Sequence, residues 1–235
     1  MVITFITSPS LIECARNLDR SRSCKQRLEA KQIIDAIDNP NGNNKGWRNH
    51  PCTKMWMGHS GALKVYYNHI VREWIARGYE NNMPLFDIQE EEYIIIPTYF
   101  DGVRTFFPVG AVFNEKTFPP WFTWAPLIYS HRAALIRKNP EYYTSMFLDS
   151  ECSKYLGSGY IWPSKLPATV WEYFDFSMIE PMGAGTPSQY RLSYEEVLEW
   201  SKNGLFNPRT GRAIKYGGPM YRDYEKAYKF FTNQV

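Results

Sequence analysis

The sequence lacks any apolar run near the roughly eighteen residues that a membrane-spanning helix needs, so we expect no membrane partner. It has no basic leader before its first apolar stretch, so we expect no signal peptide. P-loop, GxSxG and HExxH motifs are also missing, which argues against the enzyme classes that they define. The four cysteines have neither CxxC spacing nor zinc-like spacing to the four histidines. We therefore expect free thiols in a reducing, intracellular setting, with no metal and no cofactor.

Aromatic residues are abundant instead, with 8 Trp, 17 Tyr and 14 Phe in 235 residues. They can belong to a core, or they can form a surface that stacks on flat ligands. Hydrophobic residues make up 44% and charged residues 22%, which excludes a mostly disordered chain. The length suits one large domain, or one domain with a small appendage.

Charge is distributed unevenly, although the net charge is only +3. Residues 1–79 contain twelve Lys and Arg against six Asp and Glu, a net charge of +6. Residues 80–101 contain six acidic residues and no Lys or Arg, a net charge of −6. The basic first third favours binding to a polyanion such as nucleic acid, whereas the alternative is that these charges merely solvate helices.

The clearest local pattern is a helix capped by Asn17 or Asp19 and running to about Ile37. Its apolar residues recur at helical spacing and should face the core: Ala30, Ile33, Ile34 and Ile37. Polar residues three or four positions apart share another face: Arg22, Lys25, Gln26 and Glu29. This polar face carries more chemistry than any other part of the chain.

The remaining elements follow from periodicity and turn residues. The apolar run at residues 2–7 predicts a strand or a buried extended segment, and a second helix ends near Arg77 with Gly78 as its C-cap. Residues 93–109 predict a hairpin that turns at Asp101-Gly102. Further signals predict a helix capped by Ser130, a restart at Asn139-Pro140, a linker near 177–189 and a short helix over 193–202.

Three segments in order then resemble a known family. They are LDRSRSCKQRLE (residues 18–29), GWRNHP (46–51) with Met57-Gly58-His59, and SHR followed by RKNPEY (130–142). Together with the YIWP at 160–163, they resemble the pyrimidine-dimer DNA glycosylase family. The resemblance spans about residues 1–163, interrupted by an acidic hairpin insert at about 87–119.

The resemblance implies a mainly α, compact helical DNA glycosylase-like domain and a metal-independent reaction on damaged duplex DNA. In this family the N-terminal α-amine attacks the sugar carbon that bears the damaged base, and the Schiff base then permits strand cleavage by β-elimination. An α-amine suits this role, since a reference pKa of roughly 8 leaves about 10% neutral at pH 7, against about 0.04% for a lysine. Basic neighbours should lower that pKa further.

Carried over to this sequence, the nucleophile is the amine of Val2 after removal of Met1, and Glu29 is the carboxylate. Two alternatives stay open. Leu28 takes the place of the glutamate if the helix is aligned without a gap, and Lys25 is a second candidate amine. Residues expected to bind DNA are Arg22, Gln26, Arg27, Arg48, Asn49, His50, His131, Arg132, Arg137, Lys138 and Trp162, with Tyr142, Tyr143 and Tyr160 as stacking surfaces.

Near the C-terminus, Asn207-Pro208-Arg209-Thr210-Gly211-Arg212 with Ile214 resembles an adaptor-like motif of large DNA viruses, without the two cysteines that often flank it. This resemblance implies a viral gene and a module that tethers the enzyme to a partner or to DNA. We expect three parts: 1–163 as the glycosylase-like domain, 164–190 as a linker and 191–235 as a basic, aromatic module.

The sequence therefore predicts a monomeric DNA glycosylase and AP lyase for lesioned duplex DNA, in the host cytoplasm or nucleus or in the virion. One alternative is a catalytically silent DNA-binding or virion-packaging protein that retains the fold. Another is a metal-dependent nuclease using Asn49, His50 and His59, for which no carboxylates cluster in the sequence. If the acidic insert is separable, deletion of 87–119 should leave the fold intact.

Overall fold

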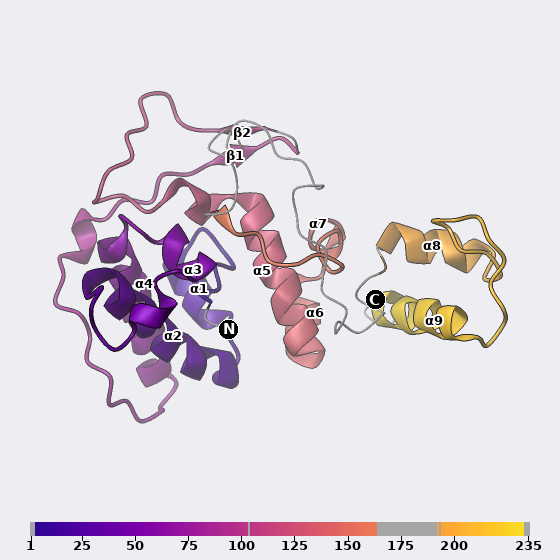
Figure 1. Cartoon of the computed structure of the whole chain (residues 1–235), viewed down its shortest axis with the longest axis horizontal. Coiled ribbons are helices and arrows are strands. Elements are labelled where there is room, and N and C mark those ends of the chain that lie inside the picture. Colours follow the sequence, from indigo (N-terminus) through magenta and orange to yellow (C-terminus); the bar gives the residue numbers. More distant parts are fainter. Residues whose placement is uncertain (1–2, 103, 164–191, 193, 233–235) are drawn as a thin grey trace. The chain divides into compact units, whose positions relative to one another are not determined.

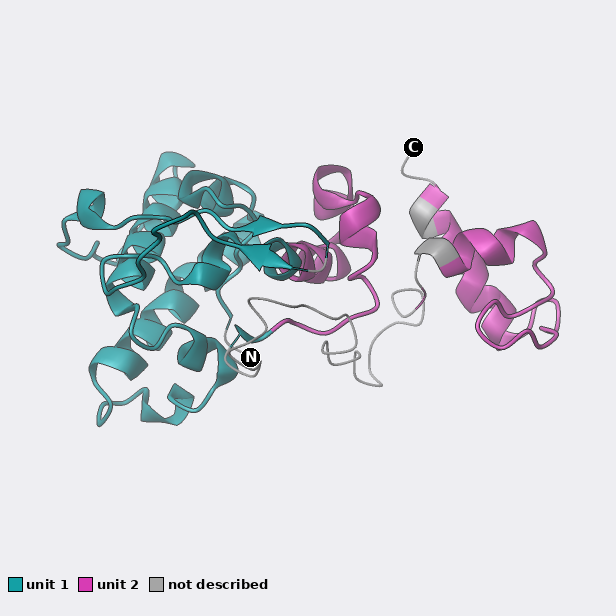
Figure 2. Ribbon diagram, turned by 90° about the horizontal axis from the view of Figure 1, so that it is seen from above, with its two compact units in different colours: residues 1–128, 162–178 teal, residues 129–161, 179–235 magenta. Residues whose placement is uncertain are grey.

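The computed structural model describes residues 3–102, 104–163, 192 and 194–232, and these are mainly α-helical as predicted (Figure 1). The chain divides into two compact units, Met1–Ile128 with Trp162–Met178 and Tyr129–Ile161 with Ile179–Val235 (Figure 2). The predicted linker at 164–190 lies outside the described residues. The division into domains at residue 163 stays a prediction.

An extended segment, residues 3–8, starts the described chain and is buried along its whole length. It forms no strand pairing in the part of the chain that the structure describes. The prediction of a buried extended segment is therefore confirmed for its described residues. Because backbone N–H and C=O groups need partners when buried, side chains must take the place of a neighbouring strand.

Helix α1 (Leu11–Arg16) follows, capped by Ser10, and leads into α2 (Arg20–Asp38). The Asp19 carboxylate caps α2 by accepting a hydrogen bond of 2.8 Å from the backbone N–H of Arg22. The predicted apolar face is buried at Ala30, Ile33 and Ile34. The predicted helix is thus confirmed, with Asp19 as its cap.

The loop after α2 contains a 3-10 turn, η1 (Lys45–Trp47), and is followed by α3 (Pro51–Met55) and α4 (Ser60–Ala76). Pro51 occupies the first turn of α3, where its missing N–H costs no hydrogen bond. Helix α4 packs against α1 and α2. Its predicted apolar stripe is buried: Leu63, Tyr66, Ile70 and Trp74.

The acidic insert contains η2 (Glu90–Glu92), then β1 (Tyr99–Phe100) and β2 (Thr105–Phe106), which pair antiparallel. The predicted hairpin is confirmed, and the backbone N–H of Arg104 bonds the Asp101 carboxylate at its turn. Each strand has only two residues. Pro97 and Pro108 flank them and cannot donate a ladder hydrogen bond, which accounts for the short pairing.

The insert is tied to the rest of its unit by side-chain contacts, and Phe118 near its end is buried. The Asn68 amide donates 2.6 Å to Glu90, whose carboxylate also accepts two hydrogen bonds from Arg72 on α4. Phe118 is buried against Phe122 of η3 (Pro120–Thr123). Deletion of 87–119 would remove these contacts, so the expectation that the fold survives it is at odds with the structure.

Helix α5 (Ala125–Lys138) is followed by α6 (Pro140–Phe147) and α7 (Ser150–Ser153). The prediction that Ser130 caps α5 is wrong, because the helix starts five residues earlier. Ser130 is buried inside it, and its hydroxyl accepts a hydrogen bond from the Ile161 N–H. The predicted restart at Pro140 is confirmed.

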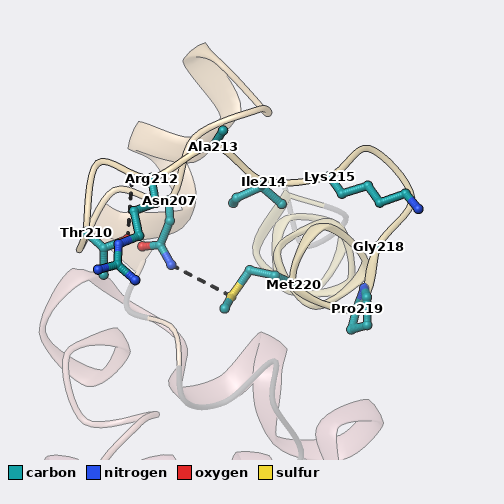
Figure 3. Close-up of a pocket in the computed structure, with 9 residues that line it drawn as sticks. All are labelled: Asn207, Thr210, Arg212, Ala213, Ile214, Lys215, Gly218, Pro219 and Met220. Atoms are coloured by element: carbon teal, nitrogen blue, oxygen red, sulfur yellow. Dashed lines mark hydrogen bonds between the residues drawn. The ribbon is translucent and has the colours of Figure 1, made fainter.

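The C-terminal module pairs α8 (Tyr194–Lys202) with α9 (Pro219–Thr232). Ser193, the predicted cap of α8, lies outside the described residues. The Trp200 ring stacks on Tyr224 with 5.4 Å between centroids and 16° between planes. The connecting loop forms a pocket of about 370 Å³, drawn in Figure 3. It is lined by Asn207, Thr210, Arg212, Ala213, Ile214, Lys215, Gly218, Pro219 and Met220.

Candidate active site and nucleic-acid interface

Side chains from α2, α4 and the loop between α3 and α4 hold the buried N-terminal segment. The Gln26 side chain accepts 2.9 Å from the Phe5 N–H and donates 2.8 Å to the Ile3 carbonyl. Tyr66 donates its hydroxyl to the Phe5 carbonyl at 2.9 Å. The Trp56 indole N–H donates to the Thr4 hydroxyl at 2.8 Å. The segment is therefore fixed in position by buried hydrogen bonds.

The Glu29 carboxylate lies at the start of this segment. Its Oε2 accepts a 3.3 Å hydrogen bond from the backbone N–H of Ile3, and the side chain is half-buried. Leu28, the alternative in the ungapped alignment, is 53% exposed. Val2, the predicted nucleophile, lies outside the described residues but is bonded directly to the Ile3 nitrogen. The carboxylate that is hydrogen-bonded to Ile3, the first described residue, is thus that of Glu29.

A buried cysteine lies close to the same segment. The Cys52 thiol is 3.6 Å from the Thr4 hydroxyl, and burial raises the pKa of that thiol to about 12. A thiol with such a pKa is protonated at neutral pH, so it is a poor nucleophile. We therefore expect Cys52 to pack beside the site without taking part in chemistry.

Several predicted DNA-binding residues are accessible in the first unit. Lys25 and Asn49 are exposed, and Arg22 and Arg48 are half-exposed. The Arg48 guanidinium also donates to the Ala36 carbonyl at 3.4 Å, which orients it from the loop toward the end of α2. Cations and amide donors with exposed surface can contact phosphates, so DNA contact at these positions stays a prediction.

Two other residues of the predicted set are buried, which contradicts their assignment to DNA. Gln26 is 1% exposed, and both the oxygen and the nitrogen of its side-chain amide are hydrogen-bonded to the N-terminal segment. Arg27 is 7% exposed, donates 2.8 Å to Asn81, and lies 3.9 Å from the centroid of the Trp74 ring. Neither side chain presents surface to a phosphate. The guanidinium of Arg27 instead joins α2 to α4 and the segment after it.

We expect Arg27→Ala to destabilise the protein by about 2–4 kcal/mol, because it removes a buried stem, a cation–π contact and the partner of Asn81. Lys25→Ala on the exposed face should cost under about 0.5 kcal/mol. Urea unfolding of the two variants measures the difference. Equal stability with weakened DNA binding in Arg27→Ala would restore the original assignment.

His50 lies between two indole rings. Its imidazole packs edge-on against Trp47 and Trp162, with 5.7 Å between ring centroids in each pair. The Nδ1 atom caps α3 by accepting 3.2 Å from the Cys52 N–H, so the neutral ring carries its proton on Nε2. Burial lowers the pKa of His50, which favours this neutral form. Trp162 is only 9% exposed, so it can offer little more than an edge to a ligand.

Protonation of the histidines should weaken the fold in acid. Burial lowers the pKa values of His50, His59 and His69 below the ordinary histidine range. The unfolded chain then binds more protons, so stability is full above about pH 6.5 and falls as the pH drops below it. We expect the Tm to fall between pH 7.5 and pH 5, and to fall less in a His59→Gln/His69→Gln variant. Equal slopes in both proteins would contradict this assignment.

In the second unit, too, some of the predicted DNA-binding residues are buried and others are accessible. His131 and Tyr143 are fully buried, which contradicts their predicted contact with DNA. Arg137 donates to the carbonyls of Tyr155 and Leu156 at 3.2 and 3.1 Å, so it holds the chain after α7. Arg132 lies over the Phe147 ring at 5.3 Å and is half-buried, while Lys138 is exposed at the end of α5.

Sequence reasoning missed the residues that hold the N-terminal segment. Tyr66 was predicted as core, but nothing in its spacing indicated a hydrogen bond to Phe5. Thr4 and Trp56 are 52 positions apart, and their contact leaves no local pattern in the sequence. Two signals pointed here: the helical spacing, which places Gln26 and Glu29 on one face, and the family resemblance, which marks Glu29 as the carboxylate.

The described residues also bear on metal and membrane binding. No group of three or more His, Cys, Asp or Glu residues there could hold a metal ion. No helix in that part of the chain is long and apolar enough to cross a membrane.

Comparison with known families agrees with the motifs. Residues 2–87 match the family model for pyrimidine dimer DNA glycosylases, and this match supports a glycosylase-like function with DNA as the substrate. Residues 199–227 match the model for the 2-cysteine adaptor domain, although this segment contains no cysteine. Both family resemblances are thus confirmed over the matched residues, whereas the motifs at 130–142 and 160–163 lie outside them and stay a prediction. Searches of curated proteins and of solved structures found no match.

Proposed function

We propose that the protein is a metal-independent DNA glycosylase and AP lyase that acts on pyrimidine dimers or other lesions in duplex DNA. The observation that carries the proposal is the contact between the Glu29 carboxylate and the backbone N–H of Ile3. It brings a carboxylate to the start of the chain, where this family's nucleophilic amine is expected. The match of residues 2–87 to the glycosylase family supports the same reaction.

Covalent geometry limits how far the proposed nucleophile can lie from the carboxylate. The α-amine of Val2, after removal of Met1, is three bonds from the Ile3 nitrogen and so at most about 3.6 Å from it. Adding the 3.3 Å contact gives an upper limit of about 7 Å between amine and carboxylate. Separations up to about 6 Å, which fall within this limit, allow proton transfer directly or through one water.

The proposed reaction proceeds in two steps. The neutral amine attacks C1′ of the damaged nucleotide, and the base leaves with the electrons of its glycosidic bond. The attached nitrogen gives up one proton, and the C1′–O4′ bond breaks as O4′ takes up a proton, so the sugar ring opens and a protonated Schiff base forms between the nitrogen and C1′. Loss of a C2′ proton then expels the 3′ phosphate. Glu29 would accept protons from the amine and stabilise positive charge at the sugar ring.

DNA binding would use the accessible cations and the aromatic cluster. Arg22, Lys25 and Arg48 would neutralise phosphates, with Asn49 as a neutral donor beside them. The ring edges of Trp47, His50 and Trp162 would lie against the nucleotide beside the lesion. Arg132 and Lys138 would contact phosphates from the second unit.

Borohydride trapping on duplex DNA with one abasic site tests the proposal. The expected result is a covalent protein–DNA adduct that forms in EDTA, together with nicking of DNA that contains a pyrimidine dimer. Mass analysis of the adduct should place the link at Val2. If no adduct forms and binding depends on salt without preference for lesions, the protein is the silent DNA-binding alternative.

A further inference from the structure

The Gln26 side chain acts as a substitute strand for the start of the chain. Its oxygen accepts from the Phe5 N–H at 2.9 Å, and its nitrogen donates to the Ile3 carbonyl at 2.8 Å. The C=O of one strand residue and the N–H two positions later face the same edge. One residue of a neighbouring parallel strand would bond this same pair. Gln26 therefore supplies, from a helix, the hydrogen bonds that a sheet would otherwise supply.

Because the hydrogen bonds of Gln26 are buried, they help to fix the position of the N-terminal segment. Gln26, Ile3 and Phe5 are all buried, and the segment has no strand partner within the described part of the chain. Without Gln26 two buried backbone groups would lose these hydrogen bonds, and a buried polar group without a partner is strongly unfavourable. The segment could regain hydrogen bonds only by moving toward water, and its first residues would move with it.

Gln26 and Glu29 are three positions apart on α2, so they lie on one face of the helix. Between them they engage both backbone groups of one residue, since Glu29 accepts from the Ile3 N–H and Gln26 donates to the Ile3 carbonyl. The same turn of helix thus fixes the segment and presents the carboxylate to it. This geometry links the position of the chain start to that of the carboxylate.

We infer that Gln26 is a positioning residue: it fixes Ile3 at the Glu29 carboxylate and thereby directs the start of the chain, where the proposed amine belongs, toward that carboxylate. The inference rests on the proposed function, because it assigns a role in delivering the nucleophile. Gln26 does not touch the substrate, since it is buried. Its effect is on the reaction rate and not on affinity for DNA.

The test uses Gln26→Met, which keeps the length of the side chain and removes both hydrogen bonds. We expect a 10- to 100-fold slower single-turnover rate of adduct formation on abasic-site DNA, as misplacement of a reacting group by about 1 Å can cost 100-fold. The Kd for the same DNA should change less than about threefold. Hydrogen exchange at the Phe5 amide should become faster, which reports the loosened segment directly.

Asn68 offers a matched control. Its amide also holds a backbone by two bonds, accepting 2.9 Å from the Phe86 N–H and donating 2.9 Å to the Phe86 carbonyl, away from the N-terminal segment. Asn68→Leu should lose a similar amount of stability and keep the wild-type rate of adduct formation. Both variants are compared well below their Tm, and Gln26→Leu, which also removes both hydrogen bonds without adding a charge, replaces Gln26→Met if the latter does not fold.

The outcomes separate the two claims. If the wild-type protein forms no adduct, the proposed function fails. If the wild type reacts and the Gln26 variant reacts as fast as Asn68→Leu, the function stands and the positioning role is refuted. A slow Gln26 variant with unchanged DNA affinity supports the inference.

Discussion

Glu29→Gln should form the borohydride-trapped adduct about 100- to 10,000-fold more slowly than the wild type, the range that a general acid or base contributes. The amide keeps the size of the side chain and an oxygen that can still accept from the Ile3 N–H. It loses the negative charge and the ability to take a proton. We therefore expect folding and DNA affinity near those of the wild type, so that the loss lies in the chemical step.

Two controls on the same helix accompany this variant. Leu28→Gln tests the ungapped alignment, and its exposed side chain predicts an unchanged rate. Asp35→Asn removes a carboxylate whose ion pair with Lys31 lies at the surface, where it contributes under about 1 kcal/mol. A Glu29→Gln protein as fast as these two controls would remove Glu29 from the mechanism.

The second large effect concerns the chain start. Protein released from a fusion so that it begins at Val2 should react, whereas the same protein with one extra glycine before Val2 should lose adduct formation by at least about 100-fold. The extra residue converts the amine of Val2 into an amide, which is not a nucleophile, and moves the new amine away from Glu29. Trapping yield, with mass analysis of each N-terminus, measures the result.

Lys25 is the competing amine, and its substitution separates the two candidates. Lys25→Met should keep the adduct and lower DNA affinity, with the slope of log K against log salt reduced by about one, as expected for loss of one phosphate contact. Loss of the adduct in Lys25→Met, together with full activity of the extended protein, would make Lys25 the nucleophile.

The C-terminal module resembles a family named for cysteines but is packed by aromatic side chains. The family is named for two cysteines, but residues 199–227 contain none. In this chain Trp200 and Tyr224 stack at its centre and the indole N–H of Trp200 bonds the Gly204 carbonyl. A domain this small has little apolar area to bury, so stacked aromatic rings provide a large share of its core.

The sequence by itself determined α2, the hairpin turn and the family likeness. Local signals sufficed for α2, because its Asp19 cap and its spacing of Ala30, Ile33 and Ile34 act within a few turns. The hairpin turn at Asp101-Gly102 was equally local. The motifs around residues 18–29 and 46–51 were read directly from the order of residues, and the family match over 2–87 agrees with them.

Only the tertiary structure decided which polar residues of α2 meet solvent. Helical spacing places Lys25, Gln26 and Glu29 on one side, yet Lys25 is exposed while Gln26 is buried under the N-terminal segment. Arg27 is covered in turn by Trp74 and Asn81. The spacing of apolar residues reveals one buried face of a helix. Helix α2 is covered on more than one side, by segments that are distant in the sequence. Whether a polar side chain binds DNA or holds the fold depends on those distant partners, which no local pattern contains.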